Sequence, residues 1–135
     1  MQMIYERIAG GQGGEETIQM VYEELREEGA ANPNDPSMAE RAYIETLLQG
    51  VLEHLDELDA RIEAASRNWT VERMPRVDLT ILRLGAWEIL YEDDVPGSVV
   101  INEAVELANR YSDPDSSRFI NGVLGTILRG KEAAE

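Results

Sequence analysis

The sequence contains no cysteine and only one histidine, His54. Disulfide frameworks, thiol nucleophiles and zinc sites made of cysteine and histidine are therefore excluded, and we expect no metal site and no cofactor. No apolar run approaches the roughly 20 residues of a membrane span, and the first residues lack the layout of a secretory signal. The chain of 135 residues has the length of one domain. We therefore expect a single cytoplasmic domain over residues 1–135.

Basic side chains are also scarce. The chain has 12 Lys and Arg against 27 Asp and Glu, which gives a formal net charge of -15. Such a charge repels phosphate backbones, so nucleic-acid binding without assistance is disfavoured. The excess of acids is larger in residues 1–66 than in residues 67–135. Any surface that faces phosphate is therefore expected in the second half.

Apolar residues recur three and four positions apart through most of the chain, and no segment alternates with the period of two that strands require. The predicted fold class is therefore all-α. The apolar stripe over 44–62 indicates one long helix that bends near Gly50 or His54. Residues 77–91 are apolar on almost every side, which predicts a central helix of the core. The Asp-Pro pair at 113–114 supplies a cap and a first turn for the last helix.

Near the start of this last helix, a basic, an aromatic and an amide side chain stand together as Arg118, Phe119 and Asn121. These are the parts that hold single-stranded RNA: a phosphate partner, a stacking face and a reader of base edges. The alternative places Phe119 in the core and leaves Arg118 solvated. Gly122 and Gly125 follow within the helix at a cost in helix propensity, and we interpret them as positions of close packing against another helix.

Two other candidates for chemistry are weak. His54 has no second histidine and no nucleophile motif beside it, so we interpret it as a packing residue of its helix. The acidic turn Glu-Asp-Asp at 92–94 offers oxygen ligands for a hard cation, but such turns are usually only solvated. We therefore expect no catalytic residue and no enzymatic activity.

Four sequence blocks follow one another in the second half. They read VDL at 77–79, LRLGAWEIL at 82–90, VPGSVVINEAVELA at 95–108 and RFINGVL at 118–124. In this order and spacing they resemble the NusB family of bacterial transcription antitermination factors. The first half matches weakly, through apolar spacing and the Gln2-x-x-Tyr5 fragment. The resemblance implies an all-helical fold of seven helices in two roughly perpendicular bundles.

The resemblance also implies a function in transcription regulation and ribosomal RNA synthesis. Family members bind the boxA element of ribosomal leader RNA as a heterodimer with NusE, a small-subunit ribosomal protein, and the pair joins the antitermination complex on RNA polymerase. A basic ribosomal protein would supply the positive charge that this acidic chain lacks. The resemblance leaves both a monomer and a homodimer open.

Site residues follow from the same resemblance. The positions that match RNA contacts of the family are Tyr5, Arg118, Phe119 and Asn121, with Asp115 at their edge. The positions at which the family presents carboxylates to its partner are Glu72 and Asp78. The alternative for these two acids is a solvated helix start, and we weigh the two interpretations equally.

The sequence departs from the family in one respect. Family members carry an arginine-rich stretch just before the Gln-x-x-Tyr segment, and this sequence starts at Met1-Gln2. Each basic residue on a phosphate adds affinity, so we expect weaker boxA binding. A gene start placed too far downstream, a greater dependence on the partner, and a loss of RNA binding each account for the departure.

Two rival functions remain at this point. NusB-like domains also occur as the N-terminal RNA-binding part of ribosomal-RNA cytosine methyltransferases, which would make this chain a fragment. Alternatively, the chain is an acidic helical scaffold that binds only proteins.

Overall fold

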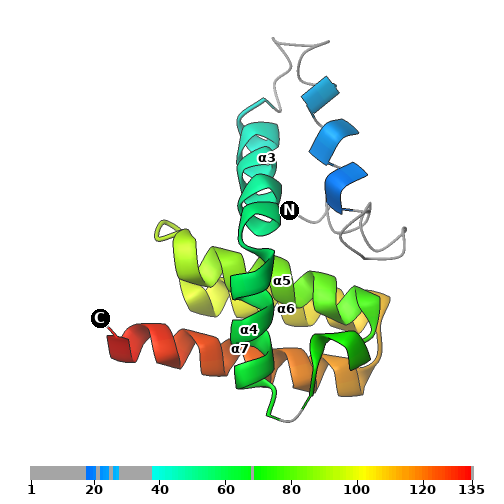
Figure 1. The fold of residues 1–135 in the computed structure, drawn as a ribbon, viewed down its shortest axis with the longest axis vertical. Coiled ribbons are helices and arrows are strands. Elements are labelled where there is room, and N and C mark those ends of the chain that lie inside the picture. Colours follow the sequence, from blue (N-terminus) through cyan, green and yellow to red (C-terminus); the bar gives the residue numbers. More distant parts are fainter. Residues whose placement is uncertain (1–17, 21, 25, 28–37, 68, 135) are drawn as a thin grey trace.

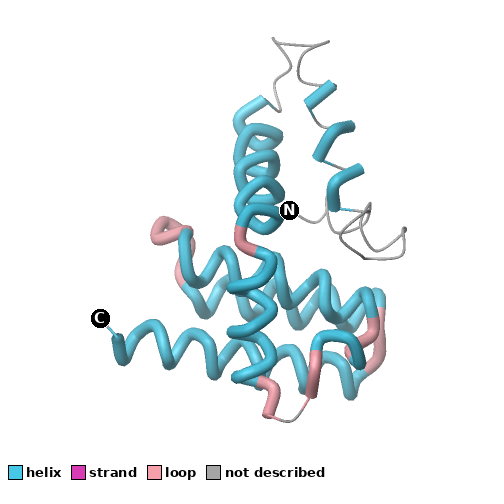
Figure 2. Tube along the Cα trace, viewed as in Figure 1, coloured by secondary structure: helices cyan, strands magenta, loops and turns pink. Residues whose placement is uncertain are grey.

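The computed structural model describes residues 18–20, 22–24, 26–27, 38–67 and 69–134. The elements are helical throughout this part of the chain, which confirms the all-α prediction (Figures 1 and 2). They are α3 (Met38–Glu53), α4 (Leu55–Ala65), the 3-10 turn η1 (Val71–Arg73), α5 (Arg76–Tyr91), α6 (Gly97–Tyr111) and α7 (Pro114–Ala134). The described residues before position 28 are helical as well. None of these helices is long and apolar enough to cross a membrane.

The helices form two groups that cross each other. Helices α5, α6 and α7 pack against one another, and α3 and α4 run steeply across them (Figure 1). Helix α4 contacts both α5 and α7, whereas α3 contacts α5. This arrangement is the one that the resemblance implied for the part of the chain that the structure describes.

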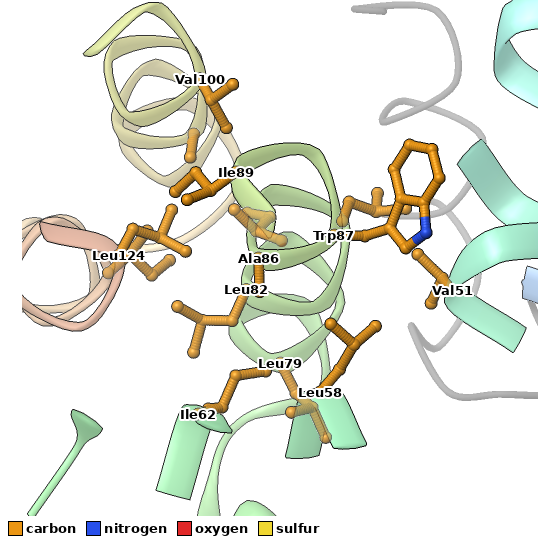
Figure 3. Close-up of a cluster of buried hydrophobic side chains, with 14 of the residues drawn as sticks. Val51, Leu58, Ile62, Leu79, Leu82, Ala86, Trp87, Ile89, Val100 and Leu124 are labelled. Atoms are coloured by element: carbon orange, nitrogen blue, oxygen red, sulfur yellow. The ribbon is translucent and has the colours of Figure 1, made fainter. Parts of the chain in front are cut away.

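Helix α5 is the centre of the core, as predicted from its apolar residues on every side. All of its residues from Asp78 to Ile89 are buried. Figure 3 shows the side chains of α5 meeting those of the four other helices. The contacting residues drawn there include Val51, Leu58, Ile62, Val100 and Leu124. Because every neighbour packs on α5, this helix fixes the position of the others.

The predicted bend between positions 50 and 54 is confirmed as a break between α3 and α4. His54 stands between the two helices, and its Nδ1–H donates to the Gly50 carbonyl over 2.8 Å. Its ring packs on Tyr91 with the ring centroids 4.7 Å apart. The histidine is therefore a packing residue, as its sequence context indicated. Glycine is required at position 50 of the same break, because a Cβ there would lie 2.2 Å from Nε1 of Trp87.

The prediction of close helix packing at Gly122 and Gly125 is wrong. A Cβ at Gly122 would meet nothing within 4 Å, and one at Gly125 would meet only Arg129 of the same helix. The reason is that α7 packs through a different face, formed by Ile120, Val123, Leu124 and Ile127. Gly122 instead lies on an exposed face.

Two charged side chains link α5 to its neighbours, one across the two helix groups and one within a group. Arg83 of α5 donates from Nε and from one terminal nitrogen to the two oxygens of Asp59 on α4, both over 2.8 Å. Lys131 near the end of α7 donates to the Ile89 carbonyl over 2.7 Å and to Asp93 over 3.0 Å. Among the described residues, no group of three His, Asp or Glu side chains is arranged to hold a metal ion.

A buried acid of α5, Glu88, is incompletely paired. It is 2% exposed, and its Oε2 accepts a hydrogen bond from the Tyr43 hydroxyl of α3 over 2.9 Å. Its Oε1 has no hydrogen-bond partner among the described residues. Burial raises the pKa of Glu88 to about 7, against the opposing effect of the Tyr43 hydrogen bond. Burial and the nearby Glu88 carboxylate likewise raise the pKa of Tyr43.

Candidate nucleic-acid interface

The first two turns of α7 carry most of the predicted RNA-contacting residues. The predicted cap is confirmed, because Oδ1 of Asp113 accepts the Ser116 backbone N–H over 2.8 Å. Asp115 and Arg118 lie on the exposed face, where their side chains are 94% and 84% exposed and 3.9 Å apart. An ion pair so exposed is weak. The guanidinium of Arg118 is therefore accessible to a phosphate.

The surroundings of Phe119 are intermediate between the two alternatives that the sequence left open, a ring available to RNA and a ring in the core. Its ring is half-buried and packs partly against the core. It also meets Trp69 edge to face, with ring centroids 6.3 Å apart and planes at 63°. Such pairs are favourable beyond the area that they bury. Asn121 follows on the exposed side of the helix.

Sequence reasoning missed Trp69 and Arg73. The Trp69 side chain is 47% exposed, and the guanidinium carbon of Arg73 lies 5.0 Å from its ring centroid. The sequence did contain a signal for these two residues. It is a large aromatic residue in a connector without helical periodicity, with an arginine four positions later and a proline soon after. The sequence predicts no apolar helix face in this connector, so it assigns an aromatic residue there no place in the core.

The connector that carries Trp69 is anchored to the end of α4. The Ser66 hydroxyl donates to the Trp69 carbonyl over 2.9 Å. A carboxylate oxygen of Glu63 accepts the Val71 backbone N–H over 3.1 Å. Arg67 reverses the chain just before, with a left-handed φ of 50°. These two hydrogen bonds hold the backbone at and just after Trp69, which is the segment that carries the indole ring.

A pocket of about 290 Å³ opens between this connector and the start of α7. We call it the Trp69–Phe119 pocket. Its lining residues are Trp69, Met74, Pro75, Asp78, Asp113, Asp115, Ser116 and Phe119. It thus brings together two segments that are distant in the sequence. Of the predicted site residues, three line it, whereas Arg118 and Asn121 lie beside it on α7 and Tyr5 is outside the described residues.

The two acids predicted to face a partner differ in their surroundings. Glu72 is exposed on η1. Asp78 is 2% exposed, and its two oxygens accept hydrogen bonds from Ser112 over 2.9 Å and from Ser116 over 2.7 Å. The alternative of a solvated helix start is therefore wrong for Asp78. Its predicted contact with a partner stays a prediction, while its visible role is to join α5 to the start of α7.

The fold and the site define a class: an all-α protein of two crossing helix groups, with exposed aromatic and arginine side chains where the connector meets the last helix. The profile of the NusB family matches residues 1–129, and the chain belongs to this family. It is a family of transcription factors rather than of enzymes.

Named relatives agree with this assignment. The transcription antitermination protein NusB of Geobacter sulfurreducens is 42% identical over 127 residues, which are 94% of this chain and 86% of that protein. The protein of the same name from Sorangium cellulosum is also 42% identical over 127 residues, with 94% and 84% covered. The solved structure of T. maritima NusB matches with a TM-score of 0.64 at 26% identity and covers 88% of this chain and 93% of that chain.

Proposed function

We propose that the protein is a transcription antitermination factor that binds boxA leader RNA together with the ribosomal protein NusE. The observation that carries the proposal is the pair of aromatic rings formed by the exposed Trp69 and the half-buried Phe119, flanked by Arg73 and Arg118. Stacking faces and guanidinium groups are what single-stranded RNA requires of a protein surface. The names of the relatives support the antitermination role.

Electrostatics supports the need for a partner. The net charge of -15 opposes an approach by RNA, and two arginines on the surface do not reverse it. A basic ribosomal protein would be attracted to the same charge and would extend the positive surface next to the arginines. We place its first contact near Glu72, because this exposed acid lies on η1, three residues after Trp69.

Binding measurements with the separate and the mixed components test the proposal. The protein and NusE should form a 1:1 complex, and fluorescence anisotropy with labelled boxA RNA should give the complex a higher affinity than either protein alone. A scrambled RNA of equal length is the control for binding through charge alone. If NusE adds no affinity, the heterodimer proposal is refuted.

Salt dependence separates this proposal from a scaffold that binds only proteins. Each phosphate contact steepens the fall of affinity with salt concentration. Replacing Arg118 with Gln should therefore weaken boxA binding and reduce the salt slope by about one contact. If the mixed proteins form a complex but bind no RNA at low salt, the scaffold interpretation is correct instead.

A further inference from the structure

We infer that the Trp69–Phe119 pocket binds one nucleobase that carries an exocyclic amino group, while Arg73 and Arg118 hold the adjoining phosphates. The inference rests on the proposed RNA binding and goes beyond it, because it assigns a base position and a base chemistry to a named cavity.

The walls of the pocket suit a flat aromatic ring. Trp69 and Phe119 line it together, and their rings stand at 63° to each other rather than in parallel. Met74 and Pro75 extend the apolar lining between them. A base that leaves its stack in single-stranded RNA gains from contact with such faces. The volume of about 290 Å³ belongs to a pocket for a small group rather than for a length of strand.

The charges in the lining decide which part of a nucleotide enters. The lining contains three carboxylates, those of Asp78, Asp113 and Asp115, and no basic residue. A phosphate would be repelled from this position, whereas a neutral base would not. The two arginines lie outside the lining, one packed on the Trp69 ring and one on the exposed face of α7. The arrangement therefore directs the base inward and the phosphates outward.

The same carboxylates decide which base is preferred. Both oxygens of Asp78 already accept hydrogen bonds from serines, and Oδ1 of Asp113 accepts the Ser116 backbone N–H. Asp115 is 94% exposed and has only a distant ion pair at 3.9 Å. An ionised carboxylate can only accept hydrogen bonds. Cytosine, adenine and guanine offer an amino group to it, whereas uracil offers only its N3–H, which stands between two carbonyl oxygens that the carboxylate repels.

A scan of the boxA RNA with 2-aminopurine in the complex with NusE tests the pocket. This fluorescent base carries an exocyclic amino group and is quenched when it stacks on an aromatic ring. We expect strong quenching on binding at one position of the RNA, and we expect Trp69→Leu to restore the fluorescence there. Trp69 is 47% exposed, so circular dichroism should show an unchanged fold for this variant.

Base analogues at the quenched position test the preference. Replacing the natural base with its analogue that lacks the exocyclic amino group should weaken binding to the wild-type complex by about tenfold. The same replacement should make little difference to a complex with Asp115→Ala, because alanine offers the amino group no acceptor. The matched control is Asp94→Ala, which removes an exposed acid far from the lining and should leave the tenfold discrimination intact.

The outcomes distinguish a failure of the pocket assignment from a failure of the proposed function. If boxA RNA binds but no position is quenched, or if the quenching is insensitive to Trp69→Leu, the pocket assignment is overturned while the proposed function stands. If discrimination persists in Asp115→Ala, the base preference is wrong. If the complex with NusE binds no RNA at all, the proposed function fails, and the inference fails with it.

Discussion

The incompletely paired Glu88 makes folding stability depend on pH in a way that one substitution should abolish. This acid is 2% exposed, one of its oxygens has no hydrogen-bond partner in the described part of the chain, and its pKa is raised from 4.5 to about 7. The folded protein therefore holds this proton more tightly than the unfolded chain does. The stabilisation is complete below pH 4.5 and is lost as the pH rises through about 7.

The size of the effect follows from the two pKa values. At 1.36 kcal/mol per pH unit, a pKa of about 7 in place of 4.5 corresponds to about 3 kcal/mol. Glu88→Gln keeps the shape and remains neutral at every pH. Relative to the wild type, the free energy of unfolding of this variant should be similar at about pH 4 and higher by about 3 kcal/mol at about pH 8. Other acids affect both proteins alike and cancel in the difference.

Urea unfolding followed by circular dichroism at a series of pH values measures this difference. Two further variants should shift the pH at which stability is lost, in opposite directions. Tyr43→Phe removes the hydrogen bond that lowers the pKa of Glu88, so the loss of stability should move to higher pH. Glu103→Gln removes a negative charge that raises this pKa, so the loss should move to lower pH. If the free energies of unfolding of the wild type and of Glu88→Gln change with pH by the same amount, the reasoning is refuted.

Three other substitutions test the packing and the site. Asp78→Ala leaves the hydroxyls of Ser112 and Ser116 without their acceptor and should cost about 3 kcal/mol in urea unfolding; a loss below about 1 kcal/mol would contradict the buried network. Gly122→Ala should stabilise the protein by about 0.5–1 kcal/mol, since a Cβ there meets nothing within 4 Å, and a lower melting temperature would show an overlooked contact. Phe119→Ala should weaken boxA binding by about 1–3 kcal/mol. Phe119→Leu, which keeps apolar volume without the ring, is the control for folding, and unchanged affinity in both variants would remove the ring from the site.

The helices could be predicted because their periodicity is a property of neighbouring residues. The central position of α5 follows from apolar residues on all its sides, and the cap at Asp113 follows from one side chain and the proline after it. The break at His54 was predicted within a few residues. Each of these features leaves a pattern in the residues of its own segment, whatever distant segments pack against it.

The features that sequence reasoning missed depend on contacts between distant segments. The role of Trp69 becomes evident only from its contact with Phe119 of α7, which is distant in the sequence. Asp78 lies in the first turn of its helix, where acids are usually solvated, and serines on either side of the α6–α7 junction bury it. Gly122 was misjudged because a cost in helix propensity says nothing about which face of the helix is covered.

The link from Asp78 to Ser112 and Ser116 also bears on how genetic data for this protein should be interpreted. The carboxylate lies beneath the Trp69–Phe119 pocket and holds the start of α7 against α5. A substitution that loosens this interior link would change the outline of the pocket above it. Screens that select for defective transcript recognition should therefore recover changes at these three positions, although none of them needs to touch a nucleotide.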